Sequence, residues 1–152
     1  MSKSRNLFDQ RLAAKYSPPI GASEYEVSEL EGSLGVTFPL AYRQFLLWMG
    51  KDKHGALKGS EWFTDDVYDN QSFLEEFLDE NAVIGVKGGK KVCFFSHQGY
   101  MAAWFSADAN EQDPKCQFYS ESNSNPVAIE TGTFSQFLLK ELNSVVKMLG
   151  QS

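Results

Sequence analysis

The residues of this chain best suited to acid–base chemistry are its two histidines, His54 and His97. An imidazole changes its charge near neutral pH, so a general acid or base would be sought there first. His54 lies in a polar stretch, Gly-Lys-Asp-Lys-His-Gly, and His97 opens a predicted turn, where a hydrogen bond is its usual role. A Ser-His-Asp site would also need a nucleophile, and the sequence has no Gly-x-Ser-x-Gly elbow. We therefore predict no catalytic residue and a protein that is not an enzyme, although a hydrolase built on paired carboxylates stays open.

The segment over residues 85–91, Gly-Val-Lys-Gly-Gly-Lys-Lys, has the residue types of a phosphate-binding loop. Such a loop reads Gly-x-x-x-x-Gly-Lys followed by Ser or Thr, and it opens into a helix whose N–H groups converge on the phosphate. Here no Ser or Thr follows the lysines, and the next residues have the pattern of a strand. We interpret Gly88-Gly89 as a two-residue hairpin turn and expect no cofactor.

Oxygen-bearing side chains alternate at Asp108, Asn110 and Gln112, as at the start of a calcium-binding loop. The sixth position of that loop needs a glycine and is Asp113 here, and the twelfth needs a glutamate and is Tyr119. We predict a solvated connection at this place and no metal.

The cysteine pattern and the chain's hydropathy indicate the cell compartment. Cys93 and Cys116 each stand alone within a predicted strand, without Cys-x-x-Cys spacing, which indicates buried free thiols in a reducing cytosol. The first residues lack the apolar core of a signal peptide, and no apolar run is long enough to span a bilayer. We expect a cytoplasmic protein with no membrane association.

One segment differs in charge from the rest of the chain. Between Lys58 and Lys87 the sequence has no lysine or arginine but eight acidic residues, so this segment carries −8 and leaves +2 for the rest of a chain with net charge −6. One interpretation is a solvated helix face with an acidic loop. The other is a surface for a cationic partner, in which acids accelerate encounter and aromatic side chains act as anchors. The second interpretation predicts these partner-binding residues: Trp62, Phe63, Asp65, Asp66, Tyr68, Asp69, Glu76, Asp79 and Glu80. The negative charge argues against direct nucleic-acid binding.

Helices that could position this segment are predicted in the first half of the chain. A helix over residues 4–16 would turn Leu7, Phe8 and Leu12 inward. Further helices are predicted over residues 23–34 and 39–49. The second of these has an inward apolar face, which includes Tyr42, Phe45, Leu46 and Met49.

Local signals mark the ends of these helices. Ser23 and Glu26 form a Ser-x-x-Glu capping box, Gly35 suits the left-handed position after a helix, and Pro39 suits a first turn. A loop is expected over residues 50–68. A further helix is expected over residues 72–79, with Ser72 and Glu75 as its capping box.

A period of two replaces the helical period after residue 81. Strands are predicted over residues 82–86, 91–96, 100–106, 116–120 and 127–130, as an antiparallel meander. Thr133 and Gln136 then cap a long C-terminal helix with a continuous apolar face. The order of elements predicts a single α+β domain, in which N-terminal helices and the C-terminal helix cover an antiparallel sheet.

Several of these fragments resemble one family when taken in order. They are Gly35 to Leu46 with its Phe-Pro-x-x-Tyr-x-x-Phe-Leu pattern, Val83-Ile84-Gly85, His97-Gln98-Gly99 before Trp104, Asp113-Pro114, and Thr133 to Leu138. Together they resemble the SUKH superfamily, which includes fungal cell-wall synthesis regulators and many bacterial toxin-immunity proteins. His97 stands where an asparagine is commoner, and the frequent glycine pair after the second helix is a lone Gly50. The resemblance implies a SUKH-like domain over residues 23–150, preceded by an N-terminal helix or extension over residues 1–22.

The resemblance also implies a function. It suggests a cytosolic immunity protein that binds and neutralises a cognate bacterial toxin, possibly a nuclease, and such an inhibitor needs no catalytic group. Nuclease toxins are often basic because they bind phosphates, so an acidic inhibitor would be complementary in charge. The alternative is a regulatory protein-binding scaffold like the fungal members.

Overall fold

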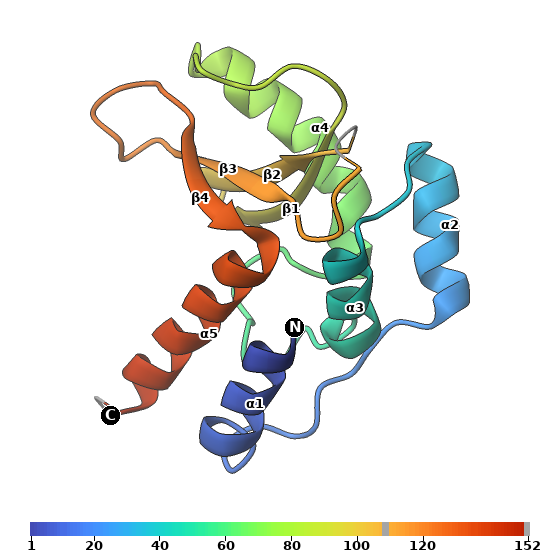
Figure 1. Cartoon of the computed structure of the whole chain (residues 1–152). Coiled ribbons are helices and arrows are strands. Elements are labelled where there is room, and N and C mark those ends of the chain that lie inside the picture. The colour runs from blue at the N-terminus through green and yellow to red at the C-terminus, as the bar shows by residue number, and fades with distance from the viewer. Residues whose placement is uncertain (108–109, 151–152) are drawn as a thin grey trace.

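The computed structural model describes residues 1–107 and 110–150. The described residues form five helices and a four-stranded antiparallel sheet (Figure 1), which confirms the predicted α+β class. In chain order the elements are α1 (Ser2–Arg11), α2 (Glu24–Leu34), α3 (Leu40–Met49), α4 (Thr64–Glu80), β1 (Lys91–His97), β2 (Met101–Ser106), β3 (Lys115–Ser120), β4 (Ile129–Thr133) and α5 (Phe134–Gly150).

The sheet is a meander with helices on both faces. Its strand order is β1-β2-β3-β4, each strand antiparallel to the next. In Figure 1 α4 lies on one side of the sheet, and α1, α3 and α5 lie on the other. Two separate clusters of buried residues result, a small one under α4 and a large aromatic one under α3 and α5.

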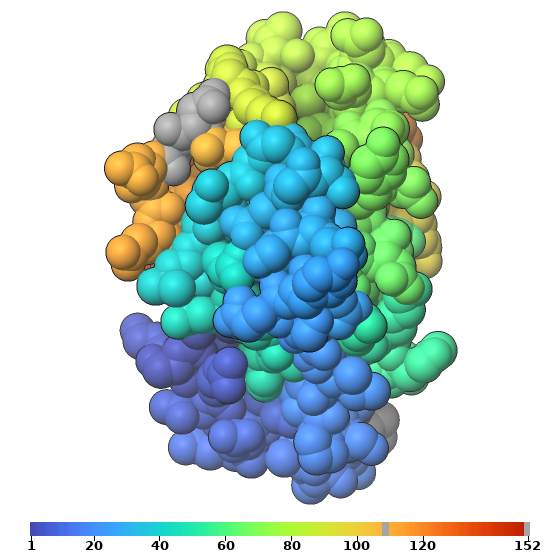
Figure 2. All heavy atoms as spheres, turned by 90° about the vertical axis from the view of Figure 1, so that its right-hand side faces the viewer, coloured from blue at the N-terminus to red at the C-terminus, as the bar shows by residue number. Residues whose placement is uncertain are grey.

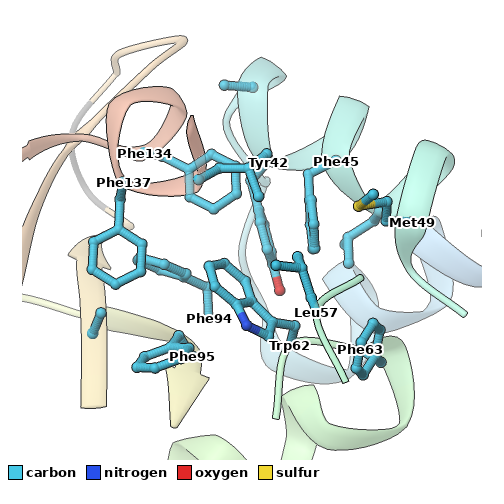
Figure 3. Packing of buried hydrophobic residues seen from close by; sticks show 14 of the residues in the cluster. Tyr42, Phe45, Met49, Leu57, Trp62, Phe63, Phe94, Phe95, Phe134 and Phe137 are labelled. Carbon is cyan, nitrogen blue, oxygen red and sulfur yellow. The ribbon is translucent and has the colours of Figure 1, made fainter. Parts of the chain in front are cut away.

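The large cluster is built from rings of distant segments (Figure 3). Tyr42 of α3 contacts Phe134 of α5 edge to face, with ring centroids 5.4 Å apart. The register of β1 against β2 shifts between Cys93 and Phe95. This irregularity brings two consecutive side chains, Phe94 and Phe95, into contact with the same ring, Phe137. The α3–α5 side of the sheet holds most of the core. Contacts between its rings stabilise the fold beyond what the burial of apolar surface provides.

The predicted helix ends are confirmed where the capping signals were local. The Ser23 hydroxyl accepts from the Glu26 N–H, and the Glu26 carboxylate accepts from the Ser23 N–H. Gly35 has φ of 66°, as a left-handed helix end requires. Thr133 and Gln136 make the same reciprocal pair at the start of α5, at 2.9 and 3.3 Å.

The helix predicted over residues 72–79 is too short at its N-terminal end. In the structure α4 begins at Thr64, so the loop predicted over residues 50–68 ends at residue 63, and the predicted box of Ser72 and Glu75 is wrong. The real cap is the Asp66 carboxylate, which accepts from the Phe63 N–H at 3.1 Å. The apolar spacing alone could not reveal the part of α4 before residue 72, because a buried polar residue, Asn70, occupies one inward position.

The strand predicted over residues 82–86 and the Gly88-Gly89 hairpin are also wrong. Only Ile84 joins a β-bridge, a parallel one with Val127, and the sheet begins at Lys91. The Gln117 side chain holds this segment over β3, since it donates to Gly85 O at 2.8 Å and accepts from the Lys87 N–H at 3.0 Å. Further along, the strand predicted over residues 127–130 begins two residues later and spans Ile129–Thr133.

The N-terminal segment contributes to the same core as the rest. Helix α1 spans Ser2–Arg11, shorter than predicted, and it contacts α5. Phe8 and Leu12 are buried in the large cluster, and the Ala22 N–H donates to Leu46 O at 2.9 Å. No helix in the described part of the chain has the length and apolar character that crossing a membrane requires.

Candidate functional site

The acidic residues of α4 line its solvent-facing side. The exposed carboxylates are spaced so that they follow one side of a 17-residue helix, which is about 25 Å long. Tyr68 lies among them as an exposed aromatic ring, with 61% of its surface accessible. We call this surface the acidic face; it consists of Asp65, Tyr68, Asp69, Glu75, Glu76, Asp79 and Glu80.

Most of the acidic face has no counter-ion among the described residues. Lys53 Nζ lies 2.6 Å from Asp65 Oδ2, and this hydrogen bond raises the pKa of the lysine. Within residues 1–107 and 110–150, no ion pair reaches the other five carboxylates of the face. Their charges therefore add to one negative potential over the length of the helix.

The position of the last two acids is unfavourable for the helix itself. Asp79 and Glu80 lie in the final turn of α4, which contains no basic residue. The C-terminal end of a helix carries a partial negative charge, so each acid there costs about 0.3–1 kcal/mol. Helix stability therefore gives no reason for these two residues.

Two of the predicted anchors are core residues, which corrects the sequence-based prediction. Trp62 is 1% exposed and Phe63 3% exposed, and Figure 3 shows Trp62 among the rings of the large cluster. The Trp62 ring centroid lies 5.0 Å from that of Phe95 and 5.8 Å from that of Phe137. An antiparallel bridge between Glu61 and Ser96 brings this segment to the edge of β1, which buries the two rings after it.

A third predicted residue, Asp66, is half-buried and serves as the cap of α4. The remaining predicted residues are exposed and lie together on the acidic face. One exposed carboxylate, Glu75, belongs to the same face and was absent from the predicted set.

Side-chain hydrogen bonds fix α4 along the outer edge of β1. The Gln71 amide donates to Cys93 O at 2.9 Å and accepts from the Cys93 N–H at 2.8 Å, as a neighbouring strand would. Asn70 donates to Glu61 O at 3.2 Å and accepts from the Ser96 hydroxyl at 2.8 Å. These bonds satisfy part of an edge strand and hold the acidic face in one orientation.

A groove of about 610 Å³ adjoins the acidic face, and no sequence pattern predicted it. It lies between α4, the end of α2 and the segment that leads to β1. Figure 2 shows these parts meeting on one side of the molecule, with α2 in blue beside α4 in green. Its lining combines apolar side chains with charged rims and includes Leu34, Val36, Leu74, Glu75, Leu78, Asp79, Val83, Val86, Lys90, Lys91 and Val92.

The groups considered for catalysis or ligand binding lie apart. Both cysteines are buried free thiols, as predicted, and burial raises the pKa of Cys93 to about 12. His97 Nδ1 lies 2.7 Å from Ser60 Oγ, but no carboxylate in the described residues is hydrogen-bonded to its other ring nitrogen. The described residues contain no group of three or more potential metal ligands, and Asp108 of the calcium-loop pattern lies outside them.

Comparison with known proteins gives one family. No curated protein matches the chain. The SMI1/KNR4 family (SUKH-1) matches residues 21–140, which contain α2 to β4 and the first turns of α5. This range includes the whole of α4 and the sheet that carries it, and it confirms the resemblance to the SUKH superfamily. The chain belongs to the SMI1/KNR4 family (SUKH-1).

Proposed function

We propose that this protein is a cytoplasmic immunity protein that binds and neutralises a cognate, basic protein toxin through the acidic face of α4. The observation that carries the proposal is the row of carboxylates with Tyr68 among them, of which only Asp65 has a basic partner in the described residues. Membership in the family supports a protein-binding role, in immunity or in regulation.

The physics of association explains why such a face suits an inhibitor. An extended negative potential accelerates the encounter with a positively charged partner and orients it before contact. A nuclease toxin is basic where it holds phosphates, so an inhibitor with this face would be attracted to its active surface. Tyr68 would then become buried at the contact, since tyrosine combines large apolar area with a polar tip.

The proposed activity is stoichiometric and needs no turnover. A toxin domain encoded beside this gene is titrated with the protein, and residual toxin activity is measured. We expect inhibition to be complete at close to one molecule per toxin. Complete inhibition at amounts far below equimolar would identify an enzyme instead. If the protein binds no such toxin and its gene stands alone, the alternative function as a regulatory scaffold is favoured.

A further inference from the structure

We propose that the groove beside α4 receives an apolar side chain of the partner protein that is flanked by a basic residue. The proposal rests on the proposed function, because it names the contact that would add specificity to the acidic face. It assigns the groove to a protein segment of defined chemistry.

The groove has the form of a site for an apolar side chain. Its floor is made of Leu74 and Val92, which are 3% and 2% exposed. Half-buried aliphatic side chains from three different segments form its walls. A volume of about 610 Å³ falls within the usual range of ligand sites, about 300–1,000 Å³. The wall residues are Leu34, Val36, Leu78, Val83 and Val86.

The walls are held in place by the backbone. Gly35 takes a left-handed conformation that ends α2, so Val36 lies on the groove side of the turn. Opposite, the Gln117 side chain fixes the backbone at Gly85 and Lys87 on either side of Val86. A groove with walls fixed in this way loses little conformational entropy when a side chain enters.

The two rims carry opposite charges. Glu75 and Asp79 line the rim on α4, are exposed and have no ion pair in the part of the chain that is described. Lys90 and Lys91 line the other rim, where each ammonium also donates to a backbone carbonyl. A basic residue next to the apolar one would therefore be attracted to the α4 rim and repelled from the other, which sets the direction of the segment.

The groove and the acidic face form one surface. Glu75 and Asp79 belong to both, so a partner attracted by the face would bring its nearest side chains to the rim of the groove. This continuity and the charge of the rim argue for a basic protein segment. They argue against a purely apolar ligand.

The test uses defined peptides and the intact protein. Three capped decapeptides share a Gly-Ser background and differ in the central triplet, which is Arg-Leu-Glu, Arg-Ala-Glu or Glu-Leu-Glu. Binding is followed by amide chemical shifts at about 0.15 M salt, which screens distant charges. We expect the Arg-Leu-Glu peptide to shift amides of α4 and of residues 83–92. It should bind about tenfold or more tightly than the alanine peptide, since burial of a leucine side chain accounts for such a factor.

Two substitutions provide a matched control. Asp79→Lys and Asp9→Lys make the same change of charge at exposed helical positions, but only Asp79 lines the groove. We expect Asp79→Lys to weaken binding of the Arg-Leu-Glu peptide several-fold and Asp9→Lys to change it less than twofold.

Equal shifts with the leucine and alanine peptides, shifts outside the groove, or no shifts at all would overturn the groove assignment. Equal effects of the two lysine substitutions would do the same. None of these results depends on inhibition of the toxin domain, so the groove assignment can be wrong while the proposed function is right. If toxin inhibition fails but the peptides bind as described, the function is wrong and the groove stands.

Discussion

Tyr42 places a polar hydroxyl inside the aromatic core. It is fully buried among Phe38, Phe105 and Phe134, and its hydroxyl has no hydrogen-bond partner among the described residues. A buried polar group without a partner opposes folding, because it loses its bonds to water. Burial raises the pKa of this phenol above its ordinary value near 10.

The substitution Tyr42→Phe tests whether the buried hydroxyl opposes folding. We expect the free energy of unfolding, measured by urea denaturation at pH 7, to stay the same or rise by about 1 kcal/mol. Because the folded-state pKa is raised, the wild type loses stability as pH rises above about 10, where the unfolded tyrosine ionises. The advantage of the phenylalanine variant should therefore grow by about 1.4 kcal/mol per pH unit above that value. A variant less stable than wild type by more than about 1 kcal/mol would indicate a hidden partner for the hydroxyl.

Trp62 and Tyr68 lie six residues apart and should respond to alanine in opposite ways. Trp62→Ala removes a buried ring and should lower the free energy of unfolding by about 3–5 kcal/mol, seen as a large fall in melting temperature. Tyr68→Ala should leave the melting temperature nearly unchanged and raise the dissociation rate of the toxin complex. If Trp62→Ala melts like the wild type and only weakens binding, the ring is an exposed anchor after all.

Among the helices and strands, α4 has acidic residues at a helix end that disfavours them. Its first turn contains Asp65 and Asp66, which favour a helix N-terminus, but its last turn contains Asp79 and Glu80, which do not favour a C-terminus. The family match shows which fold carries this helix, and helix stability does not explain the charges at its end.

Replacement of both residues, Asp79→Asn with Glu80→Gln, should therefore separate stability from binding. We expect the free energy of unfolding to rise by about 0.5–1.5 kcal/mol in low salt, because two unfavourable charges leave the helix end. Association with the toxin should become slower at the same time. A double variant that is less stable than the wild type but binds normally would show that the two acids have a structural role and no role in binding.

Element by element, the sequence predicted best where the signal was local. The capping boxes at Ser23 and Thr133 and the left-handed Gly35 were correct, since each depends on residues a few positions apart. The start of α4 was missed because Asn70 and Gln71 interrupt the apolar pattern, and their bonds go to Glu61, Cys93 and Ser96. Such partners, far away in the sequence, cannot be inferred from spacing.

For the molecule as a whole, the fold class and the meander of the four observed strands followed from the change of period and from the resemblance to the family, but the first predicted strand, over residues 82–86, is not part of the sheet. The site was predicted in part. The acids of α4 were recognised by composition, but burial of Trp62 and Phe63 depends on the bridge between Glu61 and Ser96. The groove depends on three segments that meet only in the folded chain, so no local pattern could predict it.

The negative charge of the whole molecule is concentrated in one segment. The segment between Lys58 and Lys87 carries −8 within a chain of −6, and most of these acids lie on one face. If this face meets the toxin, neutralising it should affect association far more than removing the same charge elsewhere. Three exposed acids outside α4, Asp9, Glu29 and Glu111, offer a control with the same net change and have no ion pair in the described residues.

The most direct test is the association rate with the toxin domain encoded beside this gene, measured by stopped flow at about 0.02 M and about 0.5 M salt. One variant combines Asp69→Asn, Glu76→Gln and Glu80→Gln, and the control combines Asp9→Asn, Glu29→Gln and Glu111→Gln. We expect the first variant to associate about tenfold more slowly at low salt, with a flatter salt dependence, while the control stays close to wild type. Equal rates for the two variants at low salt would contradict the proposed function, because the acidic face would then be only a solvated surface.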